Sequence, residues 1–125
     1  EREAGRTFEV LDTQLKAAIE GLSAEQFAQM VIAYEPVWAI GSGLTASPEE
    51  ARAAHGWIRS DLNRLLPGRG AGVRILYGGS VKPDTMVGLL AEPDVDGFLV
   101  GGASLDPVAF AALIRVERCT PESCP

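Results

Sequence analysis

Residues 34–46 read YEPVWAIGSGLTA and place an acid and a glycine loop directly after a short apolar run. The run 30–34 ends in the carboxylate Glu35, and Pro36 biases that residue toward an extended backbone. We therefore expect Glu35 at the exit of a strand that is buried on both faces. An acid at the carboxyl end of such a strand, beside a mobile loop, is where α/β proteins place their chemistry.

Strands and helices alternate along the rest of the chain. The expected elements are a helix from Glu3 to about Ile19, a helical turn from Ser23, and strand–helix pairs at 30–35 and 48–66, 73–77 and 83–91, and 97–100 and 107–118. Ser47 and Asp106 stand where they can cap the helices that follow them. This alternation predicts an α/β fold with a parallel sheet and right-handed crossovers.

Composition narrows the class of protein. The 125 residues suit one globular domain, predicted at 1–118, and a net charge of −6 argues against a nucleic-acid surface. No apolar run approaches the roughly twenty residues that span a membrane, and residues 1–6 lack the core of a signal peptide. We therefore expect a cytoplasmic protein without nucleic-acid or membrane partners. Cys119 and Cys124 are expected in a flexible tail, 119–125, because Thr-Pro-Glu-Ser separates them, and two cysteines alone make a poor metal site.

Two later strands also end in glycines, at Gly78-Gly79-Ser80 and at Gly101-Gly102. Backbone N–H groups in such turns, near the amino termini of helices, form a cradle for an anion. A glycine pair at a strand exit is more often only a turn. Two such exits together with the glycine loop and Glu35 favour a phosphate site with a general base.

Three motifs resemble segments of the triosephosphate isomerase family: YEPVWAIGSG at 34–43, YGGSV at 77–81 and DGFLVGGASL at 96–105. They occur in the family's order and spacing, and the resemblance extends from residue 1 to about residue 118. It implies a partial (β/α)8 barrel, with one helix followed by strands six to eight and their helices. Other phosphate-binding barrels, such as the ribulose-phosphate epimerases, lack the Glu-Pro-Val-Trp segment and rank far behind.

The resemblance implies a role for each matching residue. Glu35 is the expected general base, which interconverts dihydroxyacetone phosphate and D-glyceraldehyde 3-phosphate through an enediolate, without metal or other cofactor. The family is itself a standard example of a carboxylate base under a closing loop. The substrate phosphate is expected on the backbone N–H groups of Gly41, Ser80 and Gly102, with Gly101 alongside. The lid and latch residues implied are Pro36, Val37, Trp38, Ala39, Ile40, Ser42, Gly43 and Tyr77.

Two positions of the expected lid depart from the family's usual sequence, and several residues around it have expected contacts. Residues 44–46 are the expected second hinge, where Leu44 replaces the family's usual Lys, and Ser42 stands where Thr is frequent. Ile40 and Leu99 are expected to desolvate Glu35 and raise its basicity. Tyr77 and Ser80 are expected to hold the closed lid by hydrogen bonds.

Several of these residues also have purely structural interpretations. Tyr77 suits a core aromatic with a satisfied hydroxyl, and Ser80 suits the cap of a turn. His55, the only histidine, is interpreted as structural because it falls within a helix. Arg59 is expected to pair with Asp94 on the surface, which contributes about 0–1 kcal/mol.

The family's catalytic lysine, its electrophilic histidine and its main dimer loop have no counterpart in these residues. We therefore expect the carboxyl-terminal part of an isomerase that is usually a homodimer. On its own, such a part leaves two strand edges unpaired, so we expect low stability or aggregation and little activity. The alternative function is a non-catalytic phosphate-binding half, or one that complements a separate amino-terminal half.

Overall fold

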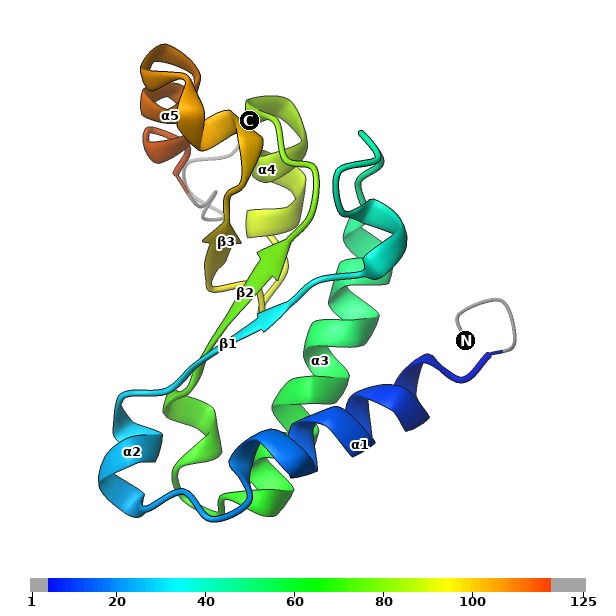
Figure 1. The fold of residues 1–125 in the computed structure, drawn as a ribbon, viewed down its shortest axis with the longest axis vertical. Helices are drawn as coiled ribbons and strands as arrows, with labels where there is room; N and C mark the ends of the chain where they lie inside the picture. The colour runs from blue at the N-terminus through cyan, green and yellow to red at the C-terminus, as the bar shows by residue number, and fades with distance from the viewer. Residues whose placement is uncertain (1–4, 118–125) are drawn as a thin grey trace.

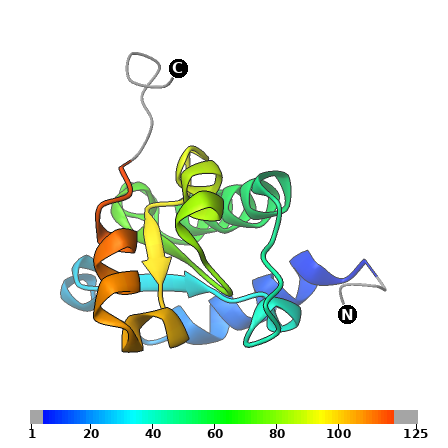
Figure 2. The same ribbon diagram turned by 90° about the horizontal axis from the view of Figure 1, so that it is seen from above.

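The computed structural model describes residues 5–117 and shows one parallel sheet with helices packed against it (Figures 1 and 2). Its elements are α1 (Thr7–Ile19), α2 (Ala24–Ala28), β1 (Val31–Tyr34), α3 (Pro48–Leu65), β2 (Arg74–Gly78), α4 (Pro83–Leu90), β3 (Gly97–Leu99) and α5 (Pro107–Ile114). Short 3₁₀ turns occupy Val37–Ala39, Gly70–Gly72 and Gly102–Leu105. The strand order is β1-β2-β3, and both neighbouring pairs are parallel. The predicted α/β class and parallel sheet are confirmed.

Several element boundaries differ from the prediction, and the strands expected at 30–35 and 73–77 lie at Val31–Tyr34 and Arg74–Gly78. The first helix begins at Thr7 and not at Glu3, which lies outside the described residues; Gly5 has φ 71°, a left-handed conformation that a continuous helix cannot contain. The last helix ends at Ile114 and not near residue 118. The third strand ends at Leu99 and not at residue 100. The predicted tail, with both cysteines, lies outside the described residues.

The predicted capping residues start two helices. Ser47 Oγ accepts from the N–H of Glu50 at 3.1 Å, and Glu50 Oε2 accepts from the N–H of Ser47 at 3.0 Å. Asp106 accepts from the N–H groups of Val108 and Ala109. Each cap satisfies donors that the first helical turn leaves unpaired, so each fixes where the chain turns from loop to helix.

The helices that build the core pack on one face of the sheet. Alternate strand residues, among them Ile32, Ile75 and Phe98, pack into two apolar clusters that include side chains of α1, α3, α4 and α5. The residues between them point to the opposite face because side chains alternate along a strand. We call this second side the open face; it consists of Val31, Ala33, Glu35, Arg74, Leu76 and Leu99.

The first strand is not buried on both faces, and that prediction was wrong. Val31 is 49% exposed, and Ala33 is exposed as well. β1 and β3 are the two edges of the sheet, and within residues 5–117 neither apolar cluster includes a side chain of the open face. The apolar run 30–34 marks a strand correctly, but it does not show which of its faces has a neighbour.

Arg59 joins α3 to the beginnings of two strands. Its guanidinium lies 3.1 Å from Asp94 and 2.8 Å from Asp96, and it donates to the carbonyl of Gly70 at 2.9 Å. Asp96 also accepts from the N–H of Ile75 at 2.8 Å. The predicted pair with Asp94 is confirmed, but the Arg59 side chain is only 15% exposed and makes two ion pairs. It is therefore an internal connection and not a surface pair.

His55 is fully buried between α3 and the sheet, which agrees with its structural interpretation. Its Nδ1 lies 3.0 Å from the carbonyl of Asp94, and its ring contacts Tyr34 edge-on and Tyr77 at a tilt. Burial lowers the pKa of His55 below its ordinary value, because the charged imidazolium loses its hydration there.

Candidate active site

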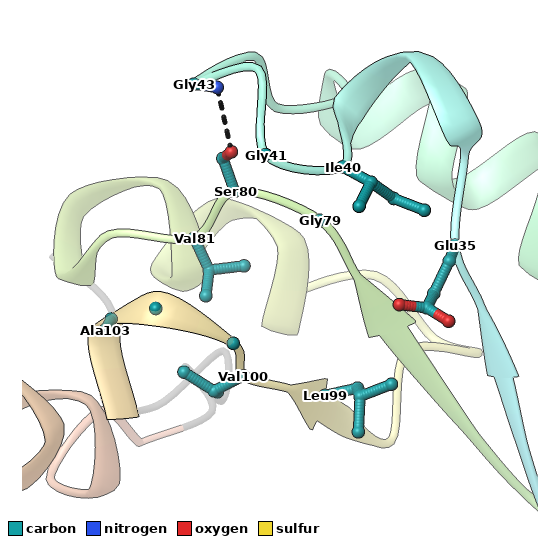
Figure 3. Close-up of a pocket in the computed structure, with 12 residues that line it drawn as sticks. Glu35, Ile40, Gly41, Gly43, Gly79, Ser80, Val81, Leu99, Val100 and Ala103 are labelled. Carbon is teal, nitrogen blue, oxygen red and sulfur yellow. Dashed lines mark hydrogen bonds between the residues drawn. The ribbon is translucent and has the colours of Figure 1, made fainter. Parts of the chain in front are cut away.

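The carboxyl ends of the strands and the loops that follow them enclose a cavity of about 420 Å³ (Figure 3). Its walls come from three separate parts of the chain, which the parallel sheet brings to one edge. The lining residues are Glu35, Ile40, Gly41, Gly43, Gly79, Ser80, Val81, Leu99, Val100, Gly101, Gly102 and Ala103. The predicted acid and the three predicted glycine loops therefore meet at one place.

Glu35 follows β1 directly, and its side chain lies over the end of β2. A Cβ atom on Gly78 would come within 2.5 Å of Glu35 Cγ, far inside van der Waals contact. Position 78 therefore admits no side chain while Glu35 holds this place. The first glycine of the Gly-Gly-Ser exit creates room for the acid as well as a turn.

The expected desolvation of Glu35 is absent from this arrangement. Glu35 is exposed, and the two apolar residues expected to cover it, Ile40 and Leu99, are themselves 51% and 45% exposed. The physical reason is that Glu35 and Leu99 belong to the open face, so one wall of the cavity is missing within the described residues.

The lid segment, residues 36–46, has internal hydrogen bonds. Ser42 Oγ donates to the carbonyl of Trp38 at 2.8 Å and accepts from the N–H of Leu44 at 3.2 Å. Gly41 and Gly43 have φ angles of 64° and 76°, which glycine adopts without strain. The 3₁₀ turn at Val37–Ala39 was not predicted from the sequence. Ser42, a mild departure from the family pattern, thus joins the two segments that were predicted as hinges.

Two of the predicted latch residues connect the predicted lid to the neighbouring strand exit. The hydroxyl of Tyr77 accepts from the N–H of Ala46 at 2.9 Å, and Ser80 Oγ accepts from the N–H of Gly43 at 3.1 Å. Thr45 Oγ1 also donates to the carbonyl of Ser80. Tyr77 is completely buried, so it is a core aromatic and a lid contact at once. Burial raises the pKa of its hydroxyl, which favours the neutral form.

The predicted anion donors differ in their availability. Among the described residues, no hydrogen bond engages the N–H groups of Gly41, Gly101 or Gly102, and all three line the cavity. The N–H of Ser80 instead donates to the carbonyl of Ala39 at 3.2 Å. In this arrangement Ser80 is a lid contact and not a free donor, because its one N–H is already used.

Four lining residues were missed by sequence reasoning. Gly79, Val81, Val100 and Ala103 flank the predicted donors, and their nearness in sequence to the glycine pairs was the available signal. All four are apolar or lack a side chain, so no chemical pattern distinguished them. They shape the cavity wall around the polar groups.

The charged lining of the cavity is a single carboxylate. Besides Glu35, the described lining contains Ser80 as its one other polar side chain, and no Lys, Arg or His. No group of three or more His, Cys, Asp or Glu suited to a metal ion occurs within residues 5–117. The groups present can remove a proton and hold an anion on backbone N–H groups.

Comparison with known proteins identifies the family. The family model described as triosephosphate isomerase matches residues 1–117. The chain belongs to the triosephosphate isomerase family. It is 56% identical over 119 residues to the triosephosphate isomerase of Citrifermentans bemidjiense, covering 94% of this chain and 47% of that relative.

Other triosephosphate isomerases match this chain with similar identity and coverage. The relative from Solibacter usitatus is 54% identical over 116 residues, covering 92% of this chain and 47% of the relative. The relative from Moorella thermoacetica is 48% identical over 118 residues, covering 94% of this chain and 47% of the relative. The chain spans about half the length of the curated relatives it matches, and its sheet is a partial barrel of this isomerase family. No helix in the described part of the chain has the length and apolarity needed to cross a membrane.

Proposed function

We propose that this chain supplies the general base and the phosphate-binding loops of a cytoplasmic triosephosphate isomerase, which interconverts dihydroxyacetone phosphate and D-glyceraldehyde 3-phosphate. The observation that carries the proposal is that Glu35 and the free N–H groups of Gly41, Gly101 and Gly102 line one cavity. A triose phosphate needs both: a base near its carbonyl and an anion cradle a few atoms away.

The chemistry follows from these groups. The Glu35 carboxylate takes a proton from the carbon beside the carbonyl, and the electrons of that C–H bond form the enediolate. The same carboxyl group returns a proton to the neighbouring carbon, so no atom is gained or lost. A positioned base of this kind contributes roughly 10²–10⁴-fold to the rate. The phosphate remains on the backbone N–H groups throughout and fixes which carbon faces Glu35.

Lid movement completes the proposed site. The lid carries Ile40, which is half exposed here, next to the exposed carboxylate. Movement of Ile40 over Glu35, opposite Leu99 at the end of β3, removes water from the carboxylate. The latch residues Tyr77 and Ser80 hold the second half of the lid through Ala46 and Gly43.

A second candidate function rests on what the cavity lining lacks. No cationic side chain of the described lining faces Glu35, so nothing there polarises the substrate carbonyl. We propose that the chain by itself binds a phosphate group without turnover. Isomerisation then requires a segment that supplies the electrophile, as an amino-terminal half of a relative does.

A mixing experiment separates the two candidates. Isomerase activity is measured for this chain alone, for the amino-terminal half of the Citrifermentans bemidjiense relative alone, and for both together. We expect activity only in the mixture, and inhibition of that activity by inorganic phosphate. An inactive mixture that forms a stable complex would leave phosphate binding as the function. Full activity of the chain alone would contradict the requirement for a second segment.

A further inference from the structure

His55 contacts the two strands that lead to Glu35 and to the Gly-Gly-Ser exit. Tyr34 and Tyr77 are register partners on β1 and β2, so both side chains point to the face on which α3 packs. The ring centroid of His55 lies 5.7 Å from that of Tyr34, edge-on, and 6.2 Å from that of Tyr77, at a tilt. Contacts between aromatic rings at these distances and angles are favourable. One imidazole thus contacts neighbouring side chains of two strands.

The carbonyl of Asp94 determines which nitrogen of this imidazole carries the hydrogen. His55 Nδ1 lies 3.0 Å from that carbonyl oxygen, and because a carbonyl only accepts, Nδ1 is the donor. Nε2 is then the bare nitrogen of a neutral ring. It is buried and has no hydrogen-bond partner within residues 5–117. A proton on Nε2 would be a buried charge without an acceptor, so the ring keeps this place only while it is neutral.

Tyr77 connects this arrangement to the lid. Its side chain is completely buried, and the rings of His55 and Phe98 both contact it, at 6.2 and 6.5 Å between centroids. Its hydroxyl accepts from the N–H of Ala46 at 2.9 Å. A Cβ on Gly79 would come within 2.8 Å of that hydroxyl oxygen, so the chain also lies close to this end of the ring. The position of the hydroxyl therefore depends on the contacts that hold its ring.

We propose that His55 is a positioning residue for the lid: its neutral imidazole holds the Tyr77 ring and so keeps the Tyr77 hydroxyl at the N–H of Ala46. Tyr34 is the second support of the imidazole. His55 does not line the cavity, so it acts on the site through Tyr77 alone. The inference rests on the proposed function, because only there does the lid have a task, which is to cover Glu35.

Protonation of His55 should therefore release the lid. Burial lowers the pKa of His55, and Asp94 and Asp96 act against that shift without reversing it. The held arrangement is complete above the ordinary pKa of about 6.5 and weakens as the pH falls below it, because an opened lid lets the imidazole take up a proton. The ionisable groups that face His55 are Tyr34 and Tyr77 on the strands, Arg59 on α3, and Asp94 and Asp96 before β3.

Amide hydrogen exchange of the 125-residue chain tests the inference without any assay of isomerase activity. The quantity measured is the protection factor of the Ala46 amide, which corrects for the intrinsic effect of pH on exchange. Low concentrations of urea distinguish two kinds of opening, because local opening exposes little surface and global unfolding exposes much. We expect the protection of Ala46 to be insensitive to urea. The protection of Leu62, a completely buried residue of α3, should fall with urea.

Two substitutions of His55 separate the effect of its ring from that of its hydrogen bond. His55→Asn keeps an N–H donor for the Asp94 carbonyl but removes the ring, and we expect it to lower the protection of Ala46 about tenfold. His55→Phe keeps a ring and should leave the protection within about threefold of the original at about pH 7.5. Between about pH 7.5 and about pH 5.5, the protection should fall about threefold to tenfold in the unmodified chain and stay constant in His55→Phe.

Trp57→Leu is the matched control, since it removes a neighbouring aromatic ring of α3 that stacks on Phe8 of α1. It should lower the protection of Leu62 and leave that of Ala46 unchanged. A purely structural role of His55 would give this same pattern in His55→Asn.

Three results would each overturn the proposal: unchanged protection of Ala46 in His55→Asn, an equal loss in His55→Phe, or an Ala46 amide that follows Leu62 in urea. If His55→Asn does not fold, the pH comparison decides, and an unmodified chain whose Ala46 protection does not fall would overturn the proposal. An inactive mixture with the amino-terminal half would count against the proposed function alone, because the exchange measurements use the single chain.

Discussion

Glu35 packs directly against Gly78 in the candidate site. Its side chain occupies the space that a side chain at position 78 would need. The acid and the glycine come from different strands, so the parallel register of β1 and β2 is what joins them. One predicted glycine thus has a role that its own sequence neighbours do not reveal.

Substitution of that glycine tests the fit. In Gly78→Ala the new methyl group displaces Glu35, and a shift of about 1 Å in a base costs on the order of 10²-fold in rate. We expect this loss in kcat of the mixture with the amino-terminal half described above. Gly72→Ala is the control, since no atom lies within 4 Å of its added Cβ. Equal activities of the two variants would contradict the assigned place of Glu35.

His55 predicts a pH dependence of stability. Its pKa is lowered by burial, so the unfolded chain binds the proton at a higher pH than the folded chain does. The free energy of unfolding is therefore complete above the ordinary pKa of about 6.5 and decreases as the pH falls below it. Urea unfolding at about pH 7.5 and about pH 5.5 measures this difference. Because the chain has one histidine, His55→Gln should reduce the difference; an unchanged pH dependence would contradict the assignment.

At the scale of elements, Arg59 connects α3 to the starts of β2 and β3. Its removal takes away the ion pairs with Asp94 and Asp96 and the hydrogen bond to the carbonyl of Gly70. Because these groups are partly buried, we expect Arg59→Met to lower the free energy of unfolding by about 2–4 kcal/mol. Lys16→Met removes an exposed pair with Asp12 and should cost about 0.5 kcal/mol or less. Urea unfolding of both variants measures the two losses in free energy. Equal losses would show that Arg59 is only a surface residue.

The hydroxyl of Tyr77 is one of the contacts that hold the predicted lid to the neighbouring strand. Tyr77→Phe removes the acceptor of the Ala46 N–H, and a buried donor without a partner costs about 1–3 kcal/mol. We expect faster hydrogen exchange at Ala46, at Gly43 to a smaller extent, and no change at Leu62 in the middle of α3. Exchange at Ala46 that matches the unmodified chain would show that Tyr77 does not hold the lid.

At the scale of the whole molecule, sequence patterns predicted the α/β class, the parallel sheet and the meeting of three loop segments at one edge. Local signals carried these predictions: the apolar runs, the capping residues and the glycine exits each depend on neighbours in the sequence. The predictions that failed depend on contacts between residues that are far apart in the sequence. The exposure of Val31, the exposure of Glu35 and the engaged N–H of Ser80 follow from which segments face each other. An amino-acid pattern does not specify those partners.

The open face explains the main disagreement between expectation and structure. A base that was expected to be desolvated is exposed because it belongs to the uncovered side of the sheet. Whatever covers that side also determines the environment of Glu35. An added amino-terminal half is therefore expected to reduce the exposure of Glu35.

The central claim is that Glu35 is the base of a triose-phosphate isomerisation. Its most direct test is kcat of the mixture with the amino-terminal half when this chain carries Glu35→Gln. Glu20→Gln, which changes an exposed carboxylate at the end of α1, serves as the control. We expect Glu35→Gln to lower kcat by roughly 10²–10⁴-fold with little change in KM, and Glu20→Gln to leave both unchanged. A Glu35→Gln mixture with undiminished kcat would contradict the account.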